Sequence, residues 1–229
     1  MNLTNTAYVL LAGLLPALLW LWFWIKEDNL HPEPKSLIAI SFIAGCMSVL
    51  LAVVLEGFAK EIISDQNYRY LAWATIEEVV KFLAVAIIAL RSKYLDEPID
   101  AMIYCITVAL GFAAVENGLF IFKSLDTNGV VDSIVTGNFR FIGATLVHIV
   151  SSASIGFMIG LSFYKGAFMK VISIIIGIIL ASTLHTSFNL AIINTTDTSA
   201  LKVFGWVWCA VVILIILFEE IKEIRPKTS

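Results

Sequence analysis

The sequence has little charge, few cysteines and no long polar segment. Of its 229 residues only 14% are charged and 59% are hydrophobic, whereas soluble globular domains carry roughly a quarter charged residues. This composition excludes a soluble fold. The net charge is -3 and the basic residues form short clusters, so nucleic acid is not expected as a partner. The three cysteines lie singly in apolar runs without a CxxC spacing, which indicates neither a disulfide nor a thiolate metal site.

What the sequence has instead is a series of apolar runs. A helix needs about 20 mostly apolar residues to cross a hydrocarbon core of about 30 Å. The runs that satisfy this length predict an all-α, polytopic membrane bundle of about seven transmembrane helices, in a single domain over residues 1–229. They lie near residues 7–25, 37–55, 71–90, 100–122, 139–163, 170–193 and 201–218.

The distribution of Lys and Arg between the connections predicts the orientation. Basic residues concentrate after the first, third and fifth runs and in the C-terminal tail, and they are sparser on the other side. The first group is Lys26, Lys35, Arg91, Lys93, Lys165, Lys170, Lys222, Arg225 and Lys227, and the second is Lys60, Arg69, Lys123, Arg140 and Lys202. Because cytoplasmic loops are enriched in Lys and Arg, we expect a multi-pass protein of the cell membrane with its N-terminus outside and its C-terminus in the cytoplasm.

The third apolar run contains three charged residues, Glu77, Glu78 and Lys81. Starting the helix after Lys81 would leave too few residues to cross the membrane, so the charges must be embedded. Each ionised group near mid-bilayer costs roughly 2.5 to 3.5 kcal/mol on insertion scales. The lysine lies four residues after Glu77 and three after Glu78, and can therefore pair with either carboxylate. Intramembrane charges of this kind predict a functional site.

Three further runs carry polar residues that lipid would exclude. They are Glu116 and Asn117; His148 with Ser151 and Ser152; and His185 with Asn189. At a rise of about 1.5 Å per residue, four ionisable residues from different runs fall roughly 9 to 13 Å below the same surface. These four are Glu77, Glu116, His148 and His185. A shared depth is expected of one site assembled from several helices, whereas unrelated structural residues would scatter in depth.

A carboxylate and two imidazoles in a pocket of low dielectric constant are the parts of a water-activating hydrolase. One glutamate would deprotonate water with the help of a histidine, and the other would pair with Lys81 or orient its neighbour. His185 and Asn189 would donate hydrogen bonds to the developing oxyanion. The sequence leaves the roles of the two glutamates open. It contains no HExxH, GxSxG or GxGD segment, so a glutamate-based mechanism remains when the other motifs are excluded.

These motifs together resemble the PrsW family of intramembrane proteases, which is related to the group containing the CAAX prenyl endopeptidase and bacteriocin-immunity-type membrane proteases. The resemblance covers residues 24–190, through KEDNLHPEP, EEVVK, DAMIYCITVALGFAAVEN, His148 and HTSFN in order. It implies catalytic positions at Glu77, Glu78, His148 and His185, with Asn189 in support. It also implies site-1-type cleavage of single-pass substrates, such as anti-sigma factors, near the extracytoplasmic face.

Two other functions use the same residues. The Glu, His and Asn side chains could bind a divalent metal ion, which would make the protein a metal-dependent membrane protease or a cation or proton transporter. A transporter often shows inverted repeats and broken helices, and the sequence shows neither. A catalytically inactive scaffold does not explain the intact polar set. The prediction is therefore a glutamic-type endopeptidase without a metal or other cofactor, acting on single-pass membrane proteins within the lipid bilayer.

Overall fold

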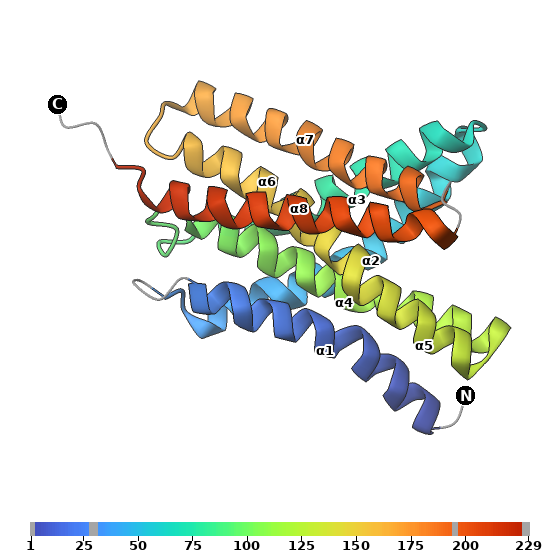
Figure 1. Cartoon of the computed structure of the whole chain (residues 1–229). Helices are drawn as coiled ribbons and strands as arrows, with labels where there is room; N and C mark the ends of the chain where they lie inside the picture. Colours follow the sequence, from blue (N-terminus) through green and yellow to red (C-terminus); the bar gives the residue numbers. More distant parts are fainter. Residues whose placement is uncertain (1–2, 28–31, 194–196, 226–229) are drawn as a thin grey trace.

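The computed structural model describes residues 3–27, 32–193 and 197–225, and all regular secondary structure in these ranges is helical. Its helices are α1 (Leu3–Glu27), α2 (Lys35–Ile62), α3 (Gln66–Ile88), α4 (Asp100–Asn128), α5 (Val130–Phe139), α6 (Thr145–Leu161), α7 (Ala167–Ile193) and α8 (Asp197–Lys222), with a π-helical turn at Arg140–Ala144 between α5 and α6. The helices run roughly along one axis, and their connections gather at two ends of the bundle (Figure 1). The predicted all-α membrane bundle is confirmed.

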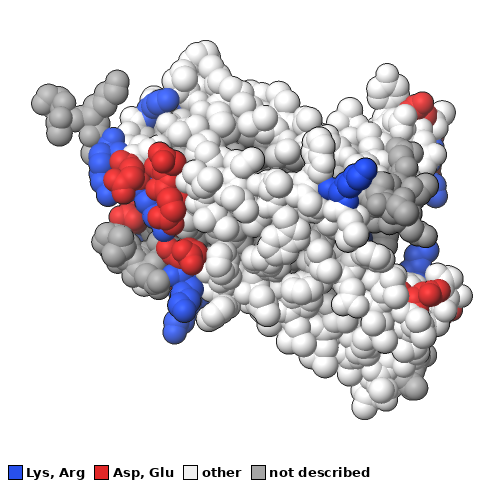
Figure 2. All heavy atoms as spheres, in the orientation of Figure 1, with Lys and Arg blue, Asp and Glu red and all other residues white. Residues whose placement is uncertain are grey.

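Within the described ranges, six helical segments are long and apolar enough to cross a membrane: α1, α2, α4, the continuous stretch Val130–Leu161, α7 and α8. The remaining predicted span is α3, which carries the three embedded charges. Figure 2 shows charged residues gathered at the two ends of the molecule and a wide band between them with almost none. Such a band is the surface that a bilayer covers.

Helix α4 is the centre of the bundle. Every residue from Asp100 to Ala114 is buried, and α1, α2 and α6 all pack against this helix. The contact with α2 is close because both helices have glycine where they cross. A Cβ added at Gly45 would lie 2.0 Å from the carbonyl oxygen of Val108, and one at Gly111 would lie 2.0 Å from that of Phe42. Small residues at such crossings let helix backbones approach in a membrane.

Local signals fix the helix ends near the membrane surfaces. The side chain of Asp65 accepts hydrogen bonds from the main-chain N–H groups of Asn67 and Tyr68 and so caps the start of α3. The guanidinium group of Arg69 donates to the carbonyl oxygens of Ile63 and Ser64 after α2. These contacts hold the short α2–α3 connection, which positions α3 between α2 and α7.

The segment between the fourth and fifth apolar runs differs from the loop that the sequence suggested. Helix continues on both sides of Gly129, which has a φ of 89°, so the connection is a tight turn between two helices. Glycine adopts this left-handed backbone without steric cost. Asp126, Thr127, Asn128 and Asp132 next to it are exposed, whereas Ser124 and Ser133 are buried.

Candidate active site

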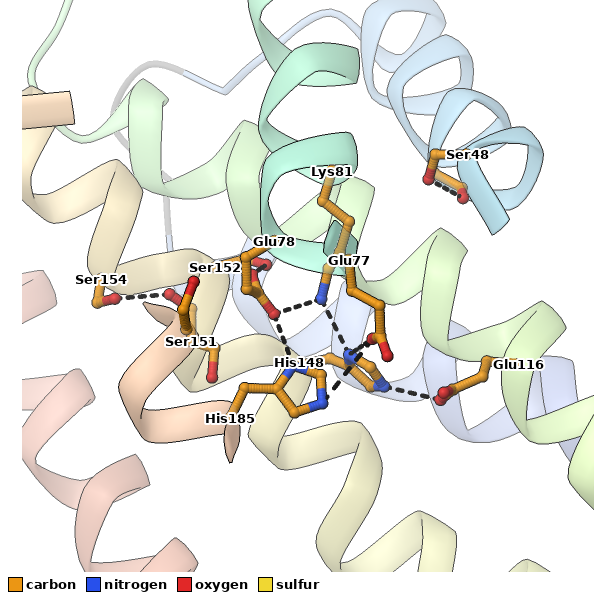
Figure 3. A network of polar contacts seen from close by, with 12 residues as sticks. Ser48, Glu77, Glu78, Lys81, Glu116, His148, Ser151, Ser152, Ser154 and His185 are labelled. Atoms are coloured by element: carbon orange, nitrogen blue, oxygen red, sulfur yellow. Dashed lines mark hydrogen bonds and ion pairs between the residues drawn. The ribbon is translucent and has the colours of Figure 1, made fainter. Parts of the chain in front are cut away.

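A cavity of about 700 Å³ lies between α2, α3, α4, the α5–α6 stretch and α7. It reaches half of the embedded polar residues predicted from the sequence. Glu77, Glu116, His148, His185 and Asn189 all line it. Figure 3 shows that the carboxylates and imidazoles point toward one another from four different helices. The four ionisable residues predicted to lie at one depth therefore also line one cavity.

Glu78 is the fully bonded member of the glutamate pair and is completely buried. Its Oε1 accepts from Lys81 Nζ at 2.5 Å and from His185 Nδ1 at 2.9 Å. Its Oε2 accepts from the hydroxyl of Ser152 at 2.8 Å. The hydrogen bonds to both oxygens hold this buried carboxylate in place, and they replace the bonds with water that it loses on burial.

The bonds to Glu78 and Lys81 determine the tautomers of the two histidines. His185 donates from Nδ1 to the Glu78 carboxylate, so a neutral ring keeps its Nε2 lone pair free. Lys81, which is only 1% exposed, also lies 3.0 Å from His148 Nδ1. An ammonium group can only donate, so this nitrogen accepts, and His148 Nε2 donates to Glu116 Oε2 at 2.9 Å.

Glu77 differs from Glu78 because its buried Oε2 has no hydrogen-bond partner among the described residues. This oxygen lies 3.8 Å from His185 Nε2 and 3.9 Å from His148 Nδ1. Both distances are too long for a direct hydrogen bond and are suited to a water molecule between the groups. The cluster therefore presents one free carboxylate oxygen and one free imidazole lone pair to the same small space.

Glu116 and Asn117 connect this cluster to the π-helical turn. Arg140, the first residue of that turn, binds Glu116 through its guanidinium group and donates from Nε to Asn117 Oδ1 at 2.5 Å. The Asn117 amide donates in turn to the hydroxyl of Thr145 at 2.9 Å. These bonds hold the helix turn that precedes His148, so Glu116 and Asn117 act on the cluster by positioning it. Isolated π-helical turns are frequent at functional sites.

The side chains of Glu77, His148 and His185 also fit a metal site in residue type and spacing. One ligand atom from each of these buried residues lies within 4.8 Å of the others. Two histidines and a glutamate are a ligand set of catalytic zinc sites, and a carboxylate bonded to the second nitrogen of a histidine ligand is common there. The ammonium group of Lys81 opposes this fit because it occupies the Nδ1 lone pair of His148 that faces Glu77.

The structure does not join every predicted residue to the cluster. Asn189 lines the cavity, one turn after His185 on α7, and Ser152 binds Glu78. Ser151 is buried but makes no bond to the cluster. Of the predicted KEDNLHPEP motif, residues 28–31 lie outside the described residues, and Glu33 does not line the cavity. Glu33 accepts a hydrogen bond from Tyr104, a residue of α4 that lies about 18 Å from Glu116 along the helix axis. Burial raises the pKa of the Glu33 carboxyl.

Sequence reasoning missed three charged residues of the cavity wall, Glu56, Lys123 and Arg140. Arg140 was counted as a surface charge for the orientation, although its place within the continuous helical stretch before His148 is a usable signal. Glu56 follows directly after the second predicted apolar run, at residues 37–55, and was not considered for the site. Helix α2 continues to Ile62, which brings Glu56 to the cavity wall.

Comparison with known proteins gives one consistent family. The model of the PrsW family intramembrane metalloproteases matches residues 33–218. The protein called Protease PrsW from Shouchella clausii is 27% identical over 184 residues, which are 79% of this chain and 81% of that protein. Its namesake from Geobacillus kaustophilus is 29% identical over 152 residues, 65% and 64% of the two chains. The one from Bacillus subtilis is 23% identical over 184 residues, 79% and 81%. No solved structure matches the chain.

Proposed function

The chain belongs to the PrsW family of intramembrane proteases, and from this premise we propose that it is an endopeptidase in which Glu77 activates water. The observation that carries the proposal is the contrast between the two glutamates. Glu78 is bonded at both oxygens, whereas Glu77 presents an unpartnered Oε2 to the cavity next to the free Nε2 of His185. Of the two glutamates, Glu77 is therefore the one with a carboxylate oxygen that no described residue occupies and that can accept a proton from water.

The reaction follows from these positions. Glu77 takes a proton from a water molecule held between its carboxylate and His185, and the resulting hydroxide attacks the carbonyl carbon of the scissile peptide bond. Asn189 on the cavity wall donates to the oxyanion that forms. When the C–N bond breaks, the protonated Glu77 returns its proton to the leaving amine, and the carboxylate is regenerated.

The remaining residues prepare this step. Glu78 fixes the ring of His185 through Nδ1, and Lys81 neutralises the charge of Glu78 at 2.5 Å. Glu116 holds His148 from the opposite side. Bonds of this kind keep a catalytic group in its productive orientation, so less reorganisation is needed during the reaction.

The substrates that this architecture suits are membrane-anchored polypeptides. The site lies among apolar helices, and a substrate held in the bilayer reaches it without leaving the lipid. We propose single-pass proteins cut near the extracytoplasmic side, with anti-sigma-factor-like proteins as the substrate class. The proposed orientation, with the N-terminus outside, rests on the Lys and Arg count.

A metal-dependent peptidase is the second candidate, and the convergence of Glu77, His148 and His185 within 4.8 Å favours it. The matching family is described as one of intramembrane metalloproteases. These three residues would hold the ion, which would supply a Lewis acid that lowers the pKa of bound water. The ammonium group of Lys81 at His148 Nδ1 favours the metal-free mechanism.

Purified protein reconstituted in liposomes with a single-pass substrate tests the proposal. We expect cleavage by the wild-type protein and a loss of at least about 100-fold in Glu77→Gln, which keeps the shape of the side chain but removes the base. A Glu61→Gln variant, altered at an exposed residue of α2, is the matched control and should cut normally. Cleavage by Glu77→Gln at the wild-type rate would exclude Glu77 as the base.

A further inference from the structure

A second cavity, of about 470 Å³, lies between α6, α7 and α8. We call it the α6–α8 groove. Its walls are mostly apolar and include Val150, Val203 and Ala210. Val147 and Phe188 line both this groove and the active-site cavity, so the two spaces meet at these side chains. Figure 1 shows α7 and α8 on the same face of the bundle, with α6 between them.

Ser151 gives the groove an unusual polar feature. The residue is fully buried, and its hydroxyl has no hydrogen-bond partner among the described residues, yet it lines the groove. The hydroxyl of the neighbouring Ser152, by contrast, has a partner, since it donates a hydrogen bond to Glu78. A buried hydroxyl without a partner costs free energy, and the cost is removed when a ligand in the groove supplies an acceptor or a donor.

We propose that the α6–α8 groove binds the membrane-spanning segment of the polypeptide substrate and that the Ser151 hydroxyl hydrogen-bonds to its main chain. This inference rests on the proposed peptidase function. A peptide must unwind locally before its scissile bond can enter the active site, and unwinding frees main-chain groups that lipid cannot satisfy. Ser151 satisfies one of them, on the helix that also carries His148.

The groove suits a helix better than a lipid chain. Its wall includes the small side chains of Ser187 and Ala210, and small residues allow close approach of a second helix in a membrane. A lipid acyl chain would fill apolar volume but offer no partner to Ser151. The contact with the active-site cavity at Val147 and Phe188 gives a bound peptide a direct route to His148 and His185.

The pair Ser151→Ala and Ser152→Ala tests the role of the hydroxyl. We expect Ser151→Ala to keep or raise the melting temperature in detergent, because it removes an unpaired buried group. It should lower kcat/KM for a membrane-anchored substrate roughly two- to tenfold, the loss expected for one hydrogen bond. Ser152→Ala should lower the melting temperature. Wild-type kcat/KM in Ser151→Ala, or a lowered melting temperature, would overturn the assignment of Ser151.

Photo-crosslinking identifies the occupant of the groove. In the Glu77→Gln background, benzoylphenylalanine at Ala210 should form an adduct with a single-pass substrate, and the same group at the lipid-exposed Val212 should form none. Adducts with lipid alone, or substrate adducts equally at both positions, would overturn the proposal. If the wild type cuts no substrate but the crosslinker at position 210 still forms a substrate adduct, the proposed peptidase function is wrong and the proposed binding groove is supported.

Discussion

Glu77 and Glu78 are adjacent in the chain, but one carboxylate is saturated with hydrogen bonds and the other has a free oxygen. Glu78 accepts from Lys81, His185 and Ser152, whereas Glu77 Oε2 has no partner among the described side chains. Successive residues on a helix project about 100° apart, so the pair cannot share a proton. In the proposed mechanism Glu78 supports the site and Glu77 transfers the proton.

The first prediction follows from this division and concerns stability. Glu78→Gln removes the anion that faces Lys81 and leaves a buried ammonium group without its counter-ion, at a cost of about 3 to 5 kcal/mol. Glu77→Gln changes a carboxylate whose Oε2 has no hydrogen-bond partner among the described residues, so this variant should melt like the wild type. Thermal unfolding in detergent measures both. Equal destabilisation of the two variants would contradict the assigned roles.

The second prediction concerns the oxyanion donor. Asn189→Ala should lower kcat by about 10²- to 10³-fold, as for other single-donor deletions, with little change in the amount of folded protein. His185→Ala should be at least as severe, since it removes the group that holds water opposite Glu77. Thr183→Ala is the control on the same helix because its exposed hydroxyl only bonds to the carbonyl of Ile179. Substrate cleavage at matched protein amounts is the measurement.

If Asn189→Ala cut at the wild-type rate while His185→Ala did not, Asn189 would be a wall residue of the cavity and the oxyanion would need another donor.

The third prediction concerns the buried ion pair. Lys81→Met leaves the Glu78 carboxylate without its ammonium partner, so expression and melting temperature should fall before catalysis can be compared. Adding Glu78→Gln to Lys81→Met should recover part of the lost stability because no unpaired charge then remains. Lys60→Met, at an exposed position of α2, should have no such effect. A double variant less stable than Lys81→Met would show that hydrogen bonding rather than charge dominates here.

How far the sequence predicts the site depends on what each residue contributes. Charges in an apolar run are informative because lipid rejects them, so Glu77, Glu78, Lys81 and both histidines were found from the sequence. Which glutamate is free was not predictable, since it depends on the side of α3 that faces Ser152 and His185. Those contacts are set by the packing of α3 against α6 and α7.

Parts of the fold were likewise predictable from the sequence, and other parts were not. Hydrophobic run lengths predicted the bundle and its spans, because crossing a bilayer fixes the length of a helix. They underestimated helices whose ends are polar, such as α2, and this underestimate hid Glu56. They also missed the π-helical turn, whose first residue, Arg140, contacts Glu116 and Asn117 on another helix.

The fourth prediction separates the two candidate mechanisms. If Glu77 activates water without a metal, cleavage should survive exhaustive chelation, and the purified protein should contain far less than one equivalent of zinc by elemental analysis. Lys81→Met removes the ammonium group from His148 Nδ1, so it should increase zinc binding by any protein that still folds. Loss of activity on chelation, with recovery on adding zinc, would establish the metal-dependent mechanism instead.

The fifth prediction concerns topology and uses two turns joined by one span. Gly129 lies between α4 and α5 and Gly166 precedes α7, and the continuous helical stretch Val130–Leu161 lies between them. Reporters inserted at these glycines should therefore be on opposite sides of the membrane, whichever way the protein is oriented. The Lys and Arg count adds that Gly129 is outside and Gly166 in the cytoplasm, together with a reporter after Ser229. Gly129 and Gly166 on the same side would contradict the span itself, whereas exchanged sides would contradict only the proposed orientation and would move the active site to the cytoplasmic half of the bilayer.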